Sequence, residues 1–115
     1  MQMPKPTAAD MERFRACVPR DPRVDVKPMF GNLGAFLNGN MFMGLFGADI
    51  GVKLSPPDAA ALLAVDGAGP FGPVERPMGG YVALPPDLIG TPEGDRLIDL
   101  ALRYVAGFPP KAPKR

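Results

Sequence analysis

Short apolar runs, separated by turn signals, occupy residues 24–54 and predict β-strands. We expect a long first strand over residues 24–37, bent at Gly31-Asn32. Asn38-Gly39 favours a two-residue hairpin of type I′, because both central residues of that turn need positive φ. A second tight turn at Ala48-Asp49 leads into the next strand. The pattern therefore predicts a meander of three antiparallel strands.

Three other segments combine helical spacing of apolar residues with a start signal. Thr7 pairs with Asp10 in a capping-box pattern, and Ser55 and Thr91 each precede proline and an acidic residue. These signals predict one helix after each of the three hydroxyl residues. The residues expected to end the helices are Pro19, Gly67 and Gly107.

Two further strands are expected around residues 71–76 and 80–84, which completes the order α-β-β-β-α-β-β-α. This order indicates an α+β fold, a two-layer sandwich whose helices cover a mainly antiparallel five-stranded sheet. A chain of 115 residues fits one domain. We assign residues 7–107 to that domain, residues 1–6 to a flexible N-terminus and residues 108–115 to a disordered basic tail.

Strict alternation from the Asn38-Gly39 hairpin divides the meander into two faces. The face expected to carry the helices holds Phe36, Met41, Met43, Leu45, Ile50, Val52 and Leu54. The opposite face, called here the second sheet face, holds Leu37, Phe42, Phe46 and Lys53. An apolar patch with charge at its rim is a candidate interaction surface. The alternative is that the chain's own curled sheet or loops cover Phe42 and Phe46.

The side-chain inventory excludes several chemistries. The chain has no histidine, so Ser-His pairs, Cys-His pairs and His-ligated metals cannot form within it. Its one cysteine, Cys17, excludes an intramolecular disulfide. A net charge of +1 gives no field for direct nucleic-acid binding, and no apolar run is long enough to span a membrane. We expect no metal, no cofactor and, without a signal-peptide pattern, a cytoplasmic location.

Four segments resemble the N-terminal domain of the TfoX/Sxy family. The most specific is Lys27-Pro28-Met29-Phe30-Gly31-Asn32, beside the family motif Arg-x-Met-Phe-Gly-Gly. The others are Phe36 to Phe42, Val52-Lys53-Leu54, and Tyr81 to Pro85 after Met78. The resemblance covers residues 10–106 and implies a two-layer fold like that of secretion chaperones. It also implies a link with competence regulation, in a stand-alone domain without the C-terminal domain of longer members.

The four residues Met29, Phe30, Gly31 and Asn32 are interpreted as a structural corner. Positive φ at Gly31 or Asn32 would bend the long strand, and Met29 or Phe30 would enter the core. This interpretation predicts that Asn32→Gly leaves stability unchanged or slightly raised.

The first functional hypothesis is a non-enzymatic regulatory or protein-interaction module that self-associates as a homodimer. It would present the second sheet face, with Leu37, Phe42, Phe46 and Lys53, to a protein. The alternative is a small acidic-metabolite binding protein that uses Lys27, Lys53 and Tyr81 over an apolar floor. Arg76 is a further candidate contact for an anion. An enzyme acting through Tyr81, Glu75 and Lys53 ranks third.

Overall fold

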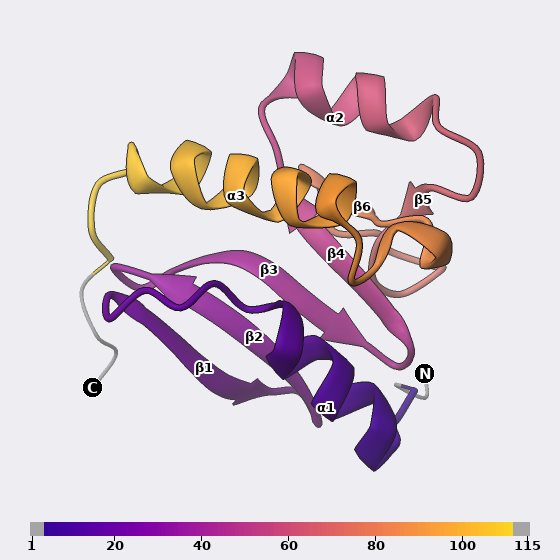
Figure 1. The fold of residues 1–115 in the computed structure, drawn as a ribbon, viewed down its shortest axis with the longest axis horizontal. Coiled ribbons are helices and arrows are strands. Elements are labelled where there is room, and N and C mark those ends of the chain that lie inside the picture. Colours follow the sequence, from indigo (N-terminus) through magenta and orange to yellow (C-terminus); the bar gives the residue numbers. More distant parts are fainter. Residues whose placement is uncertain (1–3, 112–115) are drawn as a thin grey trace.

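The computed structural model describes residues 4–111 (Figure 1). The elements follow in the order α1 (Ala8–Cys17), β1 (Val24–Met29), β2 (Asn32–Leu37), β3 (Asn40–Phe46), β4 (Asp49–Lys53), α2 (Pro56–Leu63), β5 (Gly69–Pro70), β6 (Tyr81–Ala83), the 3-10 helix η1 (Pro86–Leu88) and α3 (Pro92–Ala106). The strands form one sheet in the order β1-β2-β3-β4-β6-β5, and every neighbouring pair is antiparallel. The predicted α+β class is confirmed, with six strands in place of the expected five.

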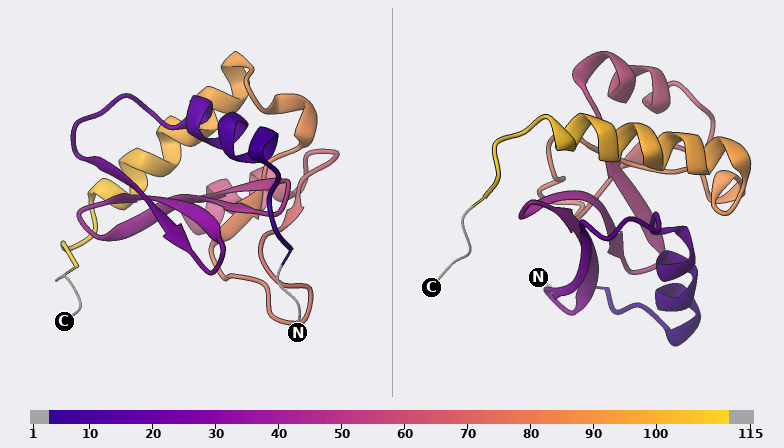
Figure 2. Two further views of the ribbon diagram at one scale, coloured as in Figure 1. Left: turned by 90° about the horizontal axis from the view of Figure 1, so that it is seen from below. Right: turned by 60° about the vertical axis from the view of Figure 1, so that its left-hand side comes forward.

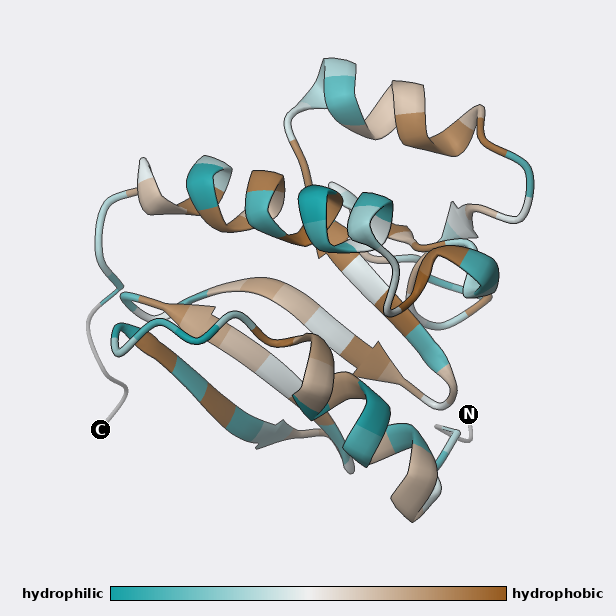
Figure 3. Ribbon diagram, in the orientation of Figure 1, coloured by the Kyte–Doolittle hydropathy of each residue, from teal (hydrophilic) through white to brown (hydrophobic). Residues whose placement is uncertain are grey.

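Helices α1 and α3 lie on one face of this sheet, and α2 contacts β6 (Figure 2). The apolar side of α3 faces the strands, and its polar side faces away (Figure 3). Phe14 of α1 is fully buried in the same core. The buried residues that α3 contributes are Gly94, Leu97, Ile98, Ala101, Leu102 and Val105.

The predicted start signals of two helices are confirmed by their hydrogen bonds. The Asp10 N–H donates to Thr7 Oγ1 over 3.1 Å, and the Thr7 N–H donates to Asp10 Oδ2 over 2.9 Å. Thr91 Oγ1 accepts from the Gly94 N–H in the same way at the start of α3. Ser55 occupies the N-cap position of α2, but its hydroxyl donates to Asp58 Oδ2 and accepts no hydrogen bond from a backbone N–H of the first turn.

The predicted long strand over residues 24–37 is wrong, because the chain reverses where a bend was expected. Phe30 and Gly31 have φ angles of 51° and 79°, and Met29 pairs with Asn32 across them. Two successive residues at positive φ make a two-residue hairpin of the type I′ kind. Residues 24–37 therefore form β1 and β2, which adds the sixth strand.

A β-bulge in β3 changes the predicted assignment of faces. The hairpin at Asn38-Gly39 forms as predicted, and Phe36 pairs with Met41. Ala35 then pairs with Met43 and not with Phe42, so Phe42 is the extra residue. A bulge interrupts the strict alternation of side chains. As a result Phe42 and Leu37 lie in the helix-covered core, whereas Phe36 and Met41 belong to the second sheet face.

The second predicted turn is displaced by one residue. Phe46 pairs with Asp49, so Gly47-Ala48 forms the turn, with Gly47 at a φ of 63°. Leu45 consequently pairs with Ile50, and the predicted pairing of Leu45 with Val52 is wrong. Both partners still face the core, because the shift moves the register by two residues.

The segment after α3 lies against the β2–β3 hairpin, which differs from the predicted disorder of residues 108–115. The Lys111 N–H donates to Asn38 O over 2.8 Å, and Asn40 Nδ2 donates to Pro109 O over 3.0 Å. The Phe108 ring packs edge-on against Tyr104. These contacts place residues 108–111 on the domain, and residues 112–115 lie outside the described residues.

Candidate binding site

Three glycines pair with one another across the centre of the second sheet face. Gly34 pairs with Gly44, and Gly44 pairs with Gly51, so this stretch of the sheet has no side chains. The ring of Phe71 lies on it and is 2% exposed. A Cβ at Gly44 would come within 3.3 Å of Phe71 Cζ and of Met41 Cε. The glycines therefore make room for Phe71 against the sheet.

Gly51→Ala is expected to destabilise the fold by about 1–3 kcal/mol, through overpacking. A Cβ at Gly51 would overlap the Phe71 ring, which the sheet and its own loop hold in place. Gly69 is the matched control, because it lies in β5 and an added Cβ there meets nothing within 4 Å. Gly69→Ala should change stability by no more than about 0.5 kcal/mol. Urea unfolding of both variants measures the difference, and equal costs would contradict this role of Phe71.

The segment from Phe71 to Gly80, between β5 and β6, crosses this face as a loop (Figure 2). The predicted strand over residues 71–76 is therefore wrong. The Met78 N–H donates to Phe71 O over 2.8 Å, which closes the loop. Phe71 also contacts Phe46 and Tyr81, with ring centroids 6.2 Å and 6.1 Å away. The loop and these rings form a small second core on the side of the sheet opposite the helices.

A pocket of about 240 Å³ opens between this loop and the β1–β2 hairpin. Its lining is apolar apart from the amide of Asn32 and the guanidinium of Arg76, and it includes no carboxylate. The lining residues are Met29, Phe30, Asn32, Leu33, Met41, Gly44, Leu45, Phe46, Phe71, Pro73, Arg76 and Met78. Three of them are methionines, whose flexible side chains adapt to different apolar surfaces.

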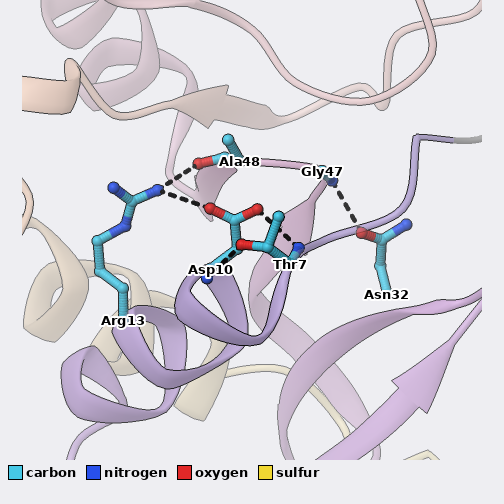
Figure 4. Close-up of polar contacts among 6 residues, drawn as sticks. All are labelled: Thr7, Asp10, Arg13, Asn32, Gly47 and Ala48. Atoms are coloured by element: carbon cyan, nitrogen blue, oxygen red, sulfur yellow. Dashed lines mark hydrogen bonds and ion pairs between the residues drawn. The ribbon is translucent and has the colours of Figure 1, made fainter.

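The amide of Asn32 serves the fold at the back of this pocket. Asn32 Oδ1 accepts from the buried Gly47 N–H over 2.8 Å (Figure 4), and Asn32 Nδ2 donates to Pro4 O over 3.1 Å. The guanidinium of Arg13, on α1, also stabilises the Gly47-Ala48 turn, because it donates to Ala48 O over 3.0 Å. Positive φ was predicted at Gly31 or Asn32, and Gly31 is the one of the two that has it, with a φ of 79°.

The rim of the pocket exposes two large apolar side chains. Phe30, at the tip of the β1–β2 hairpin, is 75% exposed, and Val74, in the loop between the lining residues Pro73 and Arg76, is 91% exposed. The prediction that Met29 or Phe30 enters the core is therefore wrong for Phe30. Met29 is half-buried and lines the pocket.

The structure places the predicted site residues in several different surroundings. Leu37 and Phe42 are fully buried under the helices and cannot reach a partner. Phe46 lines the pocket. Lys53 and Tyr81 pair on neighbouring strands of the second sheet face, and neither of them lines the pocket.

The two lysines do not converge on a common ligand. Lys27 Nζ lies 5.5 Å from the centroid of the Phe36 ring, and Lys53 Nζ lies 4.9 Å from that of Tyr81 and 5.8 Å from that of Phe108. Lys27 is on β1 and Lys53 on β4, three strand spacings or about 14 Å apart. Their arrangement favours cation–π packing over a shared anion site.

The hydroxyl of Tyr81 forms a hydrogen bond within the domain, because it donates to Met41 O over 2.8 Å. Burial raises the pKa of Tyr81 to about 12 from its usual value of 10. Glu75 is exposed in the loop. In the trio of Tyr81, Glu75 and Lys53, the phenol therefore keeps its proton at neutral pH, and its O–H donates a hydrogen bond to a backbone carbonyl.

Tyr81 also predicts a pH dependence of stability. Its folded pKa lies above its unfolded one, so between about pH 10 and pH 12 the folded state binds more protons. Stability should therefore fall as the pH rises through this window, and Tyr81→Phe should show a smaller fall. Urea unfolding at about pH 9 and about pH 11.5 compares the two proteins. An equal fall in both would contradict the assignment.

Cys17 is half-buried at the end of α1, and burial raises the pKa of its thiol, which disfavours the reactive thiolate. Within residues 4–111, no three His, Cys, Asp or Glu side chains lie close enough together to hold a metal ion. Among these residues no helix is long and apolar enough to cross a membrane.

The fold and the pocket define a small α+β domain with one helix-covered face and one face that carries an apolar pocket. The family model of the TfoX N-terminal domain matches residues 17–104, and the chain belongs to this family. At the level of the family, this membership supports a regulatory module linked with competence. Searches of curated proteins and of solved structures found no match.

Proposed function

We propose that this chain is a non-enzymatic regulatory module that binds a protein partner through the pocket on the second sheet face. The observation that carries the proposal is the backbone conformation and the exposure of Phe30. Its φ of 51° is strained for a bulky residue, and its ring is 75% exposed at the edge of an apolar pocket. Neither turn preference nor burial accounts for phenylalanine there. Residues that break local rules in this way gather at functional sites.

A protein surface is a better occupant than a small acidic metabolite. A small ligand could meet Arg76, the one charged residue of the pocket, but it would leave Val74 and the outer side of the Phe30 ring in water. A protein partner would cover both side chains and fill the pocket between them. The separation of Lys27 from Lys53 further weakens the metabolite alternative.

Site-specific photo-crosslinking in cells tests this proposal. A benzoylphenylalanine at position 74 should capture protein, whereas one at position 63, on α2 outside the pocket, should not. Leu63 is a suitable control because it is also a large exposed apolar residue, at 49%. Phe30→Asn should then abolish the adduct at position 74. Equal capture at the two positions would overturn the proposal.

A further inference from the structure

We propose that the occupant of the pocket is a second copy of this chain, in a two-fold symmetric dimer in which each copy inserts Phe30 into the other's pocket. This inference rests on the proposed function, since it identifies the partner of the same surface. In a two-fold dimer one patch meets itself, so the patch must hold both a protrusion and the hollow that receives it.

The rim of the pocket fulfils this requirement. Phe30 protrudes at the hairpin tip and borders the hollow, so a two-fold axis beside it brings each ring to the opposite pocket. The volume of about 240 Å³ lies below the usual range of about 300–1,000 Å³ for drug-sized ligands, as suits a single side chain. Phe71 and Phe46 in the lining offer aromatic edges and faces to an incoming ring.

The charges of the loop are self-complementary as well. Glu75 and Arg76 are adjacent and exposed, and neither takes part in an ion pair within residues 4–111. Across a two-fold axis, Arg76 of one copy can meet Glu75 of the other, and the contact occurs twice. The patch therefore matches itself in charge and in shape.

The edges of the sheet offer no comparable route to a dimer. The edge strand β1 has Pro28, which lacks an N–H, and carries the two charged residues Asp25 and Lys27. Proline and charged residues on an edge strand oppose pairing with another strand. The other edge, β5, has only two residues. Association through the pocket is thus favoured over continuation of the sheet.

Sedimentation velocity of the purified chain, from about 1 μM to about 1 mM, tests the inference. The wild type should dimerise, Phe30→Asn should raise the dimer Kd at least tenfold, and Leu63→Asn should leave it unchanged. Asparagine suits positive φ, so the thermal midpoint of Phe30→Asn should not fall below that of wild type at a concentration where both are monomeric. Arg76→Glu should weaken the dimer, and adding Glu75→Arg should restore it.

A wild type that stays monomeric throughout, or a Phe30→Asn variant that dimerises as well as wild type, would overturn the dimer. Failure of the double charge reversal to restore the dimer would overturn the two-fold pairing of the loops. The crosslinking at position 74 separates this inference from the proposed function. An adduct with another protein alone would refute the dimer and support a protein-binding module, and no adduct beyond that at position 63 would refute both.

Discussion

Phe42→Ala should lower the free energy of unfolding by about 3–5 kcal/mol, which is a large share of the total stability of a domain of this size. Phe42 is 0% exposed, and the bulge in β3 places its ring in the helix-covered core. Phe46→Ala should cost about 1–2 kcal/mol, because that ring is half-buried and its edge contact with Phe71 is partial.

Urea unfolding of the two alanine variants measures this contrast. Strict alternation would place both rings on one face and predict similar costs, so the comparison tests the bulge directly. Equal losses of stability would show that Phe42 and Phe46 share an environment. The double variant Phe42→Asp, Phe46→Asp should unfold, because it buries a charge in the main core.

Asn32→Gly should destabilise the domain by about 1–3 kcal/mol, because the Gly47 N–H would lose its acceptor in a buried position. Asn40→Gly is the matched control. Both residues begin strands and donate an amide N–H to a loop carbonyl, but Asn40 has an exposed hydrogen bond, to Pro109 O. Both variants include the cost of placing glycine in a strand. The difference between their free energies of unfolding therefore measures the buried hydrogen bond from the Gly47 N–H to Asn32 Oδ1.

Thermal unfolding, which measures stability, and amide hydrogen exchange at Gly47 test this prediction together. The Gly47 amide should exchange faster with solvent in Asn32→Gly than in wild type, and it should be unaffected in Asn40→Gly. A neutral Asn32→Gly with unchanged exchange at Gly47 would restore the interpretation of Asn32 as a simple turn residue.

The sequence by itself determined the elements whose causes are local. The capping residues Thr7 and Thr91 and the Asn38-Gly39 hairpin lie where their signals predicted, because each depends on groups within four residues. The apolar stripe of α3 was likewise readable, because helical spacing alone assigns those residues to one face.

Part of the site was also visible in the sequence. The motif around Met29-Phe30-Gly31 drew attention to the hairpin, and Phe46 was assigned to the correct face. Arg76 was considered only as an anion contact, and Val74 gave no signal. The spacing of Gly34, Gly44 and Gly51 could have suggested a bare stretch of sheet, but only the correct register shows that they are paired.

Tertiary structure decided the features that depend on residues far apart in the chain. Phe30 has positive φ against its own preference, because the pairing of β1 with β2 imposes the turn. Phe42 leaves the alternation of β3 because its ring enters the space under the helices. A strand has a period of two, so one extra residue exchanges the faces that follow it. Such a change is set by the packing of the whole sheet, and no local signal in the sequence encodes it.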